Sequence, residues 1–105
     1  MSNPLVSIVI PAYNSEAFIT GALESVYNQT YRPLDVIIVD DGSTDRTKEI
    51  IGKYLQGIDR LGEDDEIMLT DRRIEVKYMY QKNSGPSKAR NAGIAVSRGM
   101  SFCKE

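Results

Sequence analysis

The chain has 105 residues, 41% of them hydrophobic and 27% charged, which is the size and composition of one small globular domain. Its net charge of −2 excludes the strongly basic surface that nucleic acids attract, and the absence of histidine excludes the usual Ser-His-Asp and Cys-His catalytic groups. The single cysteine excludes an internal disulfide. With no signal-peptide pattern and no apolar run of the ~20 residues that a membrane helix needs, the sequence predicts a cytoplasmic protein. Peripheral membrane association stays open for the full-length protein.

The first predicted unit is a buried strand followed by an amphipathic helix. Leu5–Pro11 is a nearly continuous apolar run that ends in proline. The polar loop Ala12–Glu16 follows, and its Asn14 or Ser15 can cap a helix that continues to Gln29. The apolar face of this helix is predicted to contain Phe18, Ile19, Ala22, Leu23, Val26 and Tyr27.

The second unit contains two adjacent carboxylates. Leu34–Val39 ends in a continuous apolar run, which is typical of a central strand covered on both faces. Asp40 and Asp41 follow at once, and Gly42 permits a tight turn. A second amphipathic helix is predicted from Thr47 to Ile58.

The third unit begins after a charged stretch. Asp59–Arg72 has no clean period and is interpreted as a solvated connector, whereas Ile74–Gln81 alternates and predicts a half-exposed edge strand. The polar loop Lys82–Pro86 leads into a helix that Gly99 ends and whose packing face carries small residues. Met100 then begins another strand. The order β-α-β-α-β-α predicts an α/β fold of three layers, with a parallel sheet in the middle.

Polar loops follow all three predicted strands, at the carboxyl ends where open α/β sheets bind ligands. These loops carry Pro11–Glu16, Asp40–Asp45 and Asn83–Arg90. Tyr13 offers a ring that can stack on a base, and Asp41 can accept a hydrogen bond from an imide N–H or a ribose hydroxyl. Lys88 and Arg90 supply positive charge near the amino terminus of a helix. Together the loops predict a pocket for a uridine-like base, a ribose and a diphosphate.

Each of these features also has an ordinary structural explanation. The sequence Asp-Asp-Gly-Ser is common as a turn with a helix cap, and a lone tyrosine such as Tyr13 is common in cores and on surfaces. Lys88 and Arg90 alone are typical solvated charges. The functional interpretation depends on their shared place at one edge of the sheet.

Four motifs of the chain resemble, in order and spacing, those of the family 2 glycosyltransferases of the GT-A fold. The motifs are Ser7–Asn14 (SIVIPAYN), Gln29–Tyr31 (QTY), Ile38–Asp45 (IVDDGSTD) and Asn83–Gly93 (NSGPSKARNAG). The resemblance covers nearly all of this chain and the first half of that family's catalytic domain. Residues 1–105 are therefore expected to form a single, truncated, nucleotide-sugar-binding domain.

The resemblance implies an inverting enzyme that transfers a sugar from a nucleotide-sugar, most often a UDP-sugar, to a hydroxyl of a glycan or another acceptor. By the same resemblance Tyr13 lines the base, Asp41 holds it, and Arg90 closes the nucleotide side. The candidate nucleotide-sugar-binding residues are Pro11, Ala12, Tyr13, Asn14, Glu16, Asp40, Asp41, Asn83, Gly85, Lys88 and Arg90.

The resemblance also implies features beyond these residues. The family's acidic metal-binding motif and its catalytic base would follow Glu105, so a divalent Mg or Mn ion is expected for the complete enzyme. No catalytic residue or metal ligand is assigned to residues 1–105, and the chain alone is expected to be inactive. The apolar strand at Leu5–Ile10 would lie at or near an open sheet edge, poorly covered by the few residues after Gly99, which predicts self-association or marginal stability.

Other classes fit these loops less well. A response-regulator receiver needs an acceptor aspartate where this chain has Tyr80–Asn83. Nucleotidyltransferases and Rossmann oxidoreductases need a glycine-rich loop where it has Pro11–Glu16. The remaining alternative is a non-catalytic fragment that binds nucleotide or serves as a scaffold.

Overall fold

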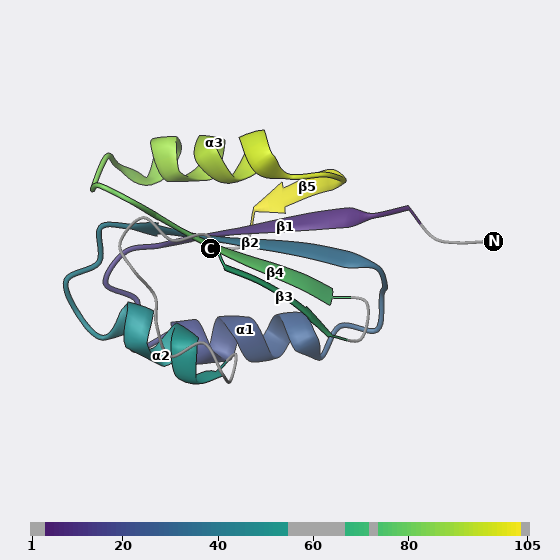
Figure 1. Ribbon diagram of the computed structural model, residues 1–105, viewed down its shortest axis with the longest axis horizontal. Coiled ribbons are helices and arrows are strands. Elements are labelled where there is room, and N and C mark those ends of the chain that lie inside the picture. Colours follow the sequence, from purple (N-terminus) through teal and green to yellow (C-terminus); the bar gives the residue numbers. More distant parts are fainter. Residues whose placement is uncertain (1–3, 55–66, 72–73, 104–105) are drawn as a thin grey trace.

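A sheet of five strands with helices on both faces organises the chain (Figure 1). The computed structural model describes residues 4–54, 67–71 and 74–103. In chain order the elements are β1 (Val6–Ala12), α1 (Ile19–Tyr27), β2 (Leu34–Asp41), α2 (Thr47–Tyr54), β3 (Ile67–Asp71), β4 (Ile74–Gln81), α3 (Pro86–Val96) and β5 (Met100–Cys103). The strand order is β3-β4-β2-β1-β5. All neighbours are parallel except β3, which runs antiparallel to β4. The predicted parallel α/β architecture is confirmed.

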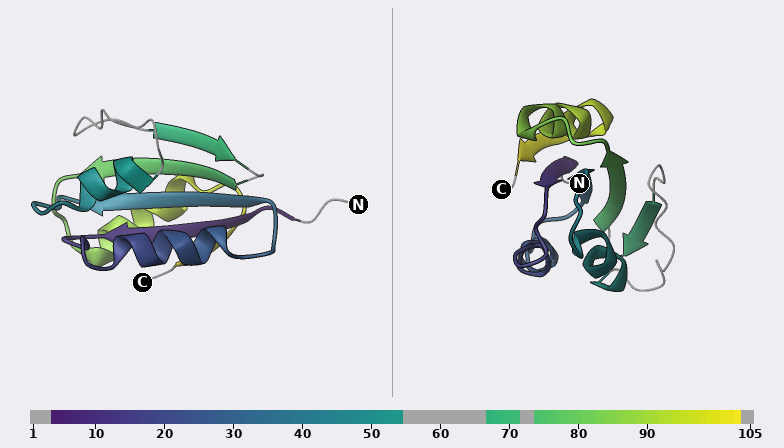
Figure 2. Two further views of the ribbon diagram at one scale, coloured as in Figure 1. Left: turned by 90° about the horizontal axis from the view of Figure 1, so that it is seen from below. Right: turned by 90° about the vertical axis from the view of Figure 1, so that its left-hand side faces the viewer.

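The helices divide the core into two parts, one on each face of the sheet. Helices α1 and α2 cover one face and α3 covers the other, as the end-on view in Figure 2 shows. Between them β2 is buried along its whole length, which explains its apolar run without alternation. On the α3 face, a Cβ added to Gly93 would lie 2.4 Å from Cγ1 of Val9. The predicted close packing of small residues against the sheet is therefore confirmed.

Strand β4 is an interior strand, so its prediction as an edge is wrong. It lies between β2 and β3, and its Ile74, Val76 and Tyr78 are buried. The predicted connector Asp59–Arg72 includes β3, while residues 59–66 and 72 lie outside the described part of the chain. The apolar part of β3 is too short, and too close to charged residues, to show a strand period.

The predicted edge at Leu5–Ile10 is covered only in part. Strand β5 pairs in parallel with β1 from Val6 to Val9, so β1 has neighbours on both sides over these residues. Among the described strands, the outermost are β3 and β5. The short strand β5 thus covers β1 as far as Val9, and Ile10 has no partner on that side among the described strands. Self-association stays a prediction.

Helix α1 begins later than its sequence pattern predicts. It starts at Ile19, and Phe18, which was assigned to the apolar face, is 76% exposed. The carbonyl of Ser15 accepts the N–H groups of Phe18 and Ile19, so a turn precedes the helix. None of the helices in the described residues combines the length and the apolar character that crossing a bilayer requires.

Candidate functional site

A cavity of about 500 Å³ lies at the carboxyl ends of β1 and β2 and beside the start of α3. Its lining residues are Pro11, Ala12, Tyr13, Ser15, Asp41, Asn83, Gly85, Pro86 and Ala89. Six of these were predicted from the sequence as nucleotide-sugar-binding residues. The topology explains why they meet, because parallel strands bring the loops that follow them to one edge of the sheet.

Tyr13 is the aromatic group of this cavity. Its residue is 52% exposed, and its N–H donates to Oγ of Ser15 at 3.2 Å. The backbone contact holds the residue at the cavity wall, and its phenol forms no hydrogen bond within the described residues. The ring is therefore available to a flat ligand.

Asp41 lies at the floor of the cavity and joins three elements. It is 4% exposed, and its Oδ1 accepts hydrogen bonds from Nε2 of Gln81 and the N–H of Ser84, both at 2.8 Å. Its Oδ2 accepts the N–H of Gly85 at 3.0 Å. Gly85 precedes α3 with a φ of 101°, a conformation that favours glycine. The carboxylate of Asp41 thus holds the end of β4 and the entry to α3 beside the end of β2.

Asp40 is buried below the site and does not line the cavity. One carboxylate oxygen accepts the hydroxyl of Tyr78 at 2.8 Å, and the other accepts the N–H of Ser43 at 2.9 Å. Burial, followed by the hydrogen bond to Asp40, raises the pKa of Tyr78 far above its ordinary value. The structure therefore gives Asp40 an internal role in fixing the turn after β2.

Asn14 and Glu16 connect the first loop to the second and also lie outside the cavity lining. Asn14 has a φ of 48°, its Oδ1 accepts the N–H of Thr44 at 2.8 Å, and its own N–H donates to Oγ of Ser43 at 2.9 Å. The N–H of Glu16 donates to Asp45 at 3.2 Å. These contacts hold the loop that carries Tyr13 against the loop that follows Asp41.

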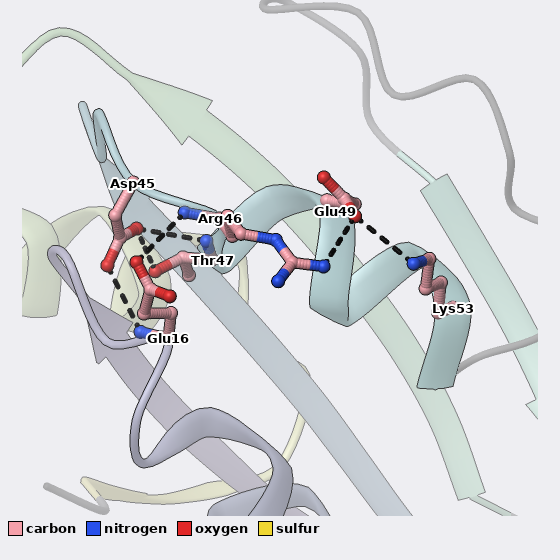
Figure 3. A network of polar contacts seen from close by, with 6 residues as sticks. All are labelled: Glu16, Asp45, Arg46, Thr47, Glu49 and Lys53. Atoms are coloured by element: carbon pink, nitrogen blue, oxygen red, sulfur yellow. Dashed lines mark hydrogen bonds and ion pairs between the residues drawn. The ribbon is translucent and has the colours of Figure 1, made fainter.

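Asp45 lies at one end of the polar network shown in Figure 3, where it contacts Glu16 and Thr47. Oδ1 of Asp45 accepts a hydrogen bond from the N–H of Thr47 at 2.9 Å, and Oδ2 of Asp45 accepts one from the backbone N–H of Glu16 in the first loop. Farther along α2, Glu49 pairs with Arg46 at 2.9 Å and with Lys53 at 3.1 Å. Burial alone would raise the pKa of Asp45, but the hydrogen bonds from Thr47 and Glu16 outweigh it and lower the pKa. Asp45 therefore caps α2 and fastens the first loop to it.

This lowered pKa predicts a pH-dependent contribution to stability. Since the folded-state pKa of Asp45 lies below its ordinary value of 3.8, its charge stabilises the fold above that pH, and the contribution is lost as the pH falls through the folded-state pKa. Solvent screens the partly exposed carboxylate, so Asp45→Asn is expected to cost about 0.5 kcal/mol at neutral pH. Urea unfolding of both proteins between neutral and acidic pH measures this cost. A cost that grows on acidification would contradict the assignment.

Lys88 and Arg90 are exposed on α3, and neither lines the cavity. The structure thus brings the aromatic and carboxylate candidates together without the two cations. Four further residues of the site were not among the predicted binding residues. Ser15, Pro86 and Ala89 line the cavity, and Gln81 binds Asp41 from the last position of β4. In the sequence Gln81 is one of several outward polar residues of an alternating strand, so only the pairing of β4 with β2 reveals it.

The profile of the family described as "Glycosyl transferase family 2" matches residues 7–102. The chain belongs to glycosyl transferase family 2. Among its family 2 relatives, an uncharacterised glycosyltransferase of Haemophilus influenzae is 34% identical over 99 residues, which cover 94% of this chain and 34% of that protein. Chondroitin synthase of Escherichia coli is 38% identical over 97 residues, which cover 92% of this chain and 12% of that protein. The chain therefore spans about a third or less of the length of these relatives.

Solved structures of glycosyltransferases share the GT-A fold of this family 2 chain. TarS of S. aureus in complex with UDP-GlcNAc superposes with a TM-score of 0.67 at 30% identity. The superposed region covers 98% of this chain and 26% of the TarS chain. The TarS complex with UDP superposes with a TM-score of 0.69 at 27% identity, over 98% of this chain and 27% of the TarS chain. A mannosyltransferase of Pyrobaculum calidifontis, in complex with GDP-Man and Mn2+, superposes with a TM-score of 0.68 at 23% identity, over 94% of this chain and 26% of the mannosyltransferase chain. This last likeness shows the fold alone.

The described residues of this family 2 chain do not fit the divalent metal that the resemblance implies. Within 4–54, 67–71 and 74–103, no three carboxylate or cysteine side chains gather in a way that could hold a metal ion. Asp40 and Asp41 are adjacent along a strand, so their side chains point to opposite faces of the sheet. Their oxygens are already engaged by protein donors, Asp40 by Tyr78 and Asp41 by Gln81 among others. No step through a metal is assigned to these side chains.

Proposed function

We propose that this chain forms the donor-binding part of a glycosyltransferase that takes its sugar from a UDP-sugar and transfers it, with inversion, to an acceptor hydroxyl. The observation that carries the proposal is the cavity at the strand ends, in which an exposed aromatic ring and a nearly buried carboxylate line one space. The TarS complexes with UDP and UDP-GlcNAc, at 27% and 30% identity, support a uridine nucleotide as the ligand.

In this proposal the base lies between Tyr13 and the floor of the cavity. The ring of Tyr13 stacks on the base, and Asp41 accepts the imide N–H of uracil through the acceptor capacity that its protein contacts leave. Lys88 and Arg90, exposed on α3, are the proposed partners of the diphosphate where it leaves the cavity. A divalent metal belongs to the proposal for the whole enzyme only, and no side chain described here is assigned to it.

Tyr13→Ala tests the proposal without disturbing the fold. Because the side chain is exposed and forms no hydrogen bond within the described residues, its removal is expected to leave the melting temperature unchanged. Stacking on a base contributes ~1–3 kcal/mol, so the UDP affinity is expected to fall about tenfold or more. Calorimetric titration of the purified chain with UDP measures the affinity.

Phe18→Ala is the matched control. Phe18 is the other strongly exposed aromatic residue near the first loop, and it does not line the cavity. Its removal is expected to leave UDP binding unchanged. Equal losses in the two variants would argue against stacking on Tyr13, and no UDP binding by the unmodified chain at millimolar concentration would favour the scaffold alternative.

A further inference from the structure

Gln81 occupies part of the acceptor capacity of Asp41. The two residues are register partners at the ends of β4 and β2, and Nε2 of Gln81 donates to Oδ1 of Asp41 at 2.8 Å. The N–H of Ser84 donates to the same oxygen at 2.8 Å, whereas Oδ2 receives only the N–H of Gly85 among the described donors. An ionised carboxylate has about four acceptor positions, two on each oxygen. Oδ1 is therefore saturated, and Asp41 keeps one acceptor position, on Oδ2.

We propose that Gln81 determines the base specificity of the site, because it leaves Asp41 able to accept only one hydrogen bond from a base. This inference rests on the proposed nucleotide function. Uracil presents a single imide N–H between two carbonyl groups, so one acceptor satisfies it. Guanine presents two neighbouring donors, its ring N–H and its amino group, which match the two oxygens of a free carboxylate. With Oδ1 saturated, the second guanine donor loses its partner, and a buried unpaired donor is costly.

Gln81 suits this role better than the other two donors to Asp41. Ser84 and Gly85 donate through backbone N–H groups, which every substitution except proline leaves in place. The amide of Gln81 is neutral, so it fills a lone pair without cancelling the charge that attracts the base N–H. Its removal opens one position on Oδ1 and leaves both backbone contacts in place. The expected result is a site that accepts two donors from one base.

The test compares UDP, GDP and inosine diphosphate (IDP), whose base has the ring N–H of guanine but lacks the amino group. Each is titrated calorimetrically into the unmodified chain and into Gln81→Leu. The unmodified chain is expected to bind UDP best, and GDP no more tightly than IDP. Gln81→Leu is expected to bind GDP about tenfold more tightly than IDP, because a hydrogen bond to a charged acceptor is regained. Gln29→Leu, the same change at an exposed residue of the turn before β2, is the control.

The outcomes separate this inference from the proposed function. If the unmodified chain prefers UDP but Gln81→Leu weakens all three nucleotides equally, Gln81 only supports the structure, and the inference fails alone. A preference of the unmodified chain for GDP over IDP would also overturn it, and that measurement needs no variant that folds. Gln81→Ala provides a second variant with the same expected change. If UDP does not bind the unmodified chain, the proposed function and this inference both fail.

Discussion

Replacing Gly42 by alanine is expected to lower the free energy of unfolding by about 3 kcal/mol. Gly42 has a φ of 77°, where an L side chain costs ~1–2 kcal/mol, and an added Cβ would lie 2.7 Å from the backbone nitrogen of Asn83. That contact is with backbone, so a side-chain rotation cannot relieve it. The loop after β2 would have to move away from the loop after β4. Since Asp41, next to Gly42 at the end of β2, and Asn83, in the loop after β4, both line the cavity, the UDP affinity is expected to fall as well.

Urea unfolding followed by circular dichroism measures the loss of stability, and Gly21→Ala is the matched control. Gly21 lies in α1 with no atom within 4 Å of an added Cβ. Alanine is the better helix former, so this variant is expected to gain ~0.5–1 kcal/mol. A Gly42→Ala variant as stable as the unmodified chain would show that the two loops do not need their close approach.

The arrangement of the site follows from patterns that one sequence displays. The apolar run of β2 predicts a strand buried on both faces, and the structure buries all of it. Alternation of strands and helices predicts a parallel sheet, and a parallel sheet brings the loops after β1, β2 and β4 to one edge. These local patterns explain why Tyr13, Asp41 and Asn83 could be placed together in advance.

Partners that depend on strand pairing could not be predicted in the same way. An alternating pattern shows that β4 has one covered face, but it does not show which strands lie beside it, so the antiparallel neighbour β3 was missed. Asp41 was predicted as an acceptor for the ligand, but its donors within the protein, Gln81, Ser84 and Gly85, were not predicted. These donors are about 40 residues away along the chain, and no local pattern contains them.

Asp40→Ala is expected to destabilise the fold by about 2–4 kcal/mol, because it leaves the buried hydroxyl of Tyr78 and the partly buried N–H of Ser43 without their acceptor. The carboxylate is fully buried and accepts the hydroxyl of Tyr78 at 2.8 Å and the N–H of Ser43 at 2.9 Å. Among the described residues, no buried side-chain polar atom lacks a partner, so the variant would introduce the first such defect. Denaturant unfolding at neutral pH measures the loss.

A double-mutant cycle with Tyr78→Phe decides whether the loss of stability in Asp40→Ala comes from the Tyr78 hydroxyl that has lost its acceptor. Tyr78→Phe removes that donor, so the pair of substitutions is expected to cost less than the sum of the single ones by about 1–3 kcal/mol. Asp40→Asn keeps an acceptor for Ser43 and is expected to cost less than Asp40→Ala. If the two single costs simply add, the hydroxyl of Tyr78 does not depend on Asp40. Asp40 would then stabilise the turn before α2 through Ser43 alone, and Asp41 would be the only carboxylate of the pair that connects β2 to β4.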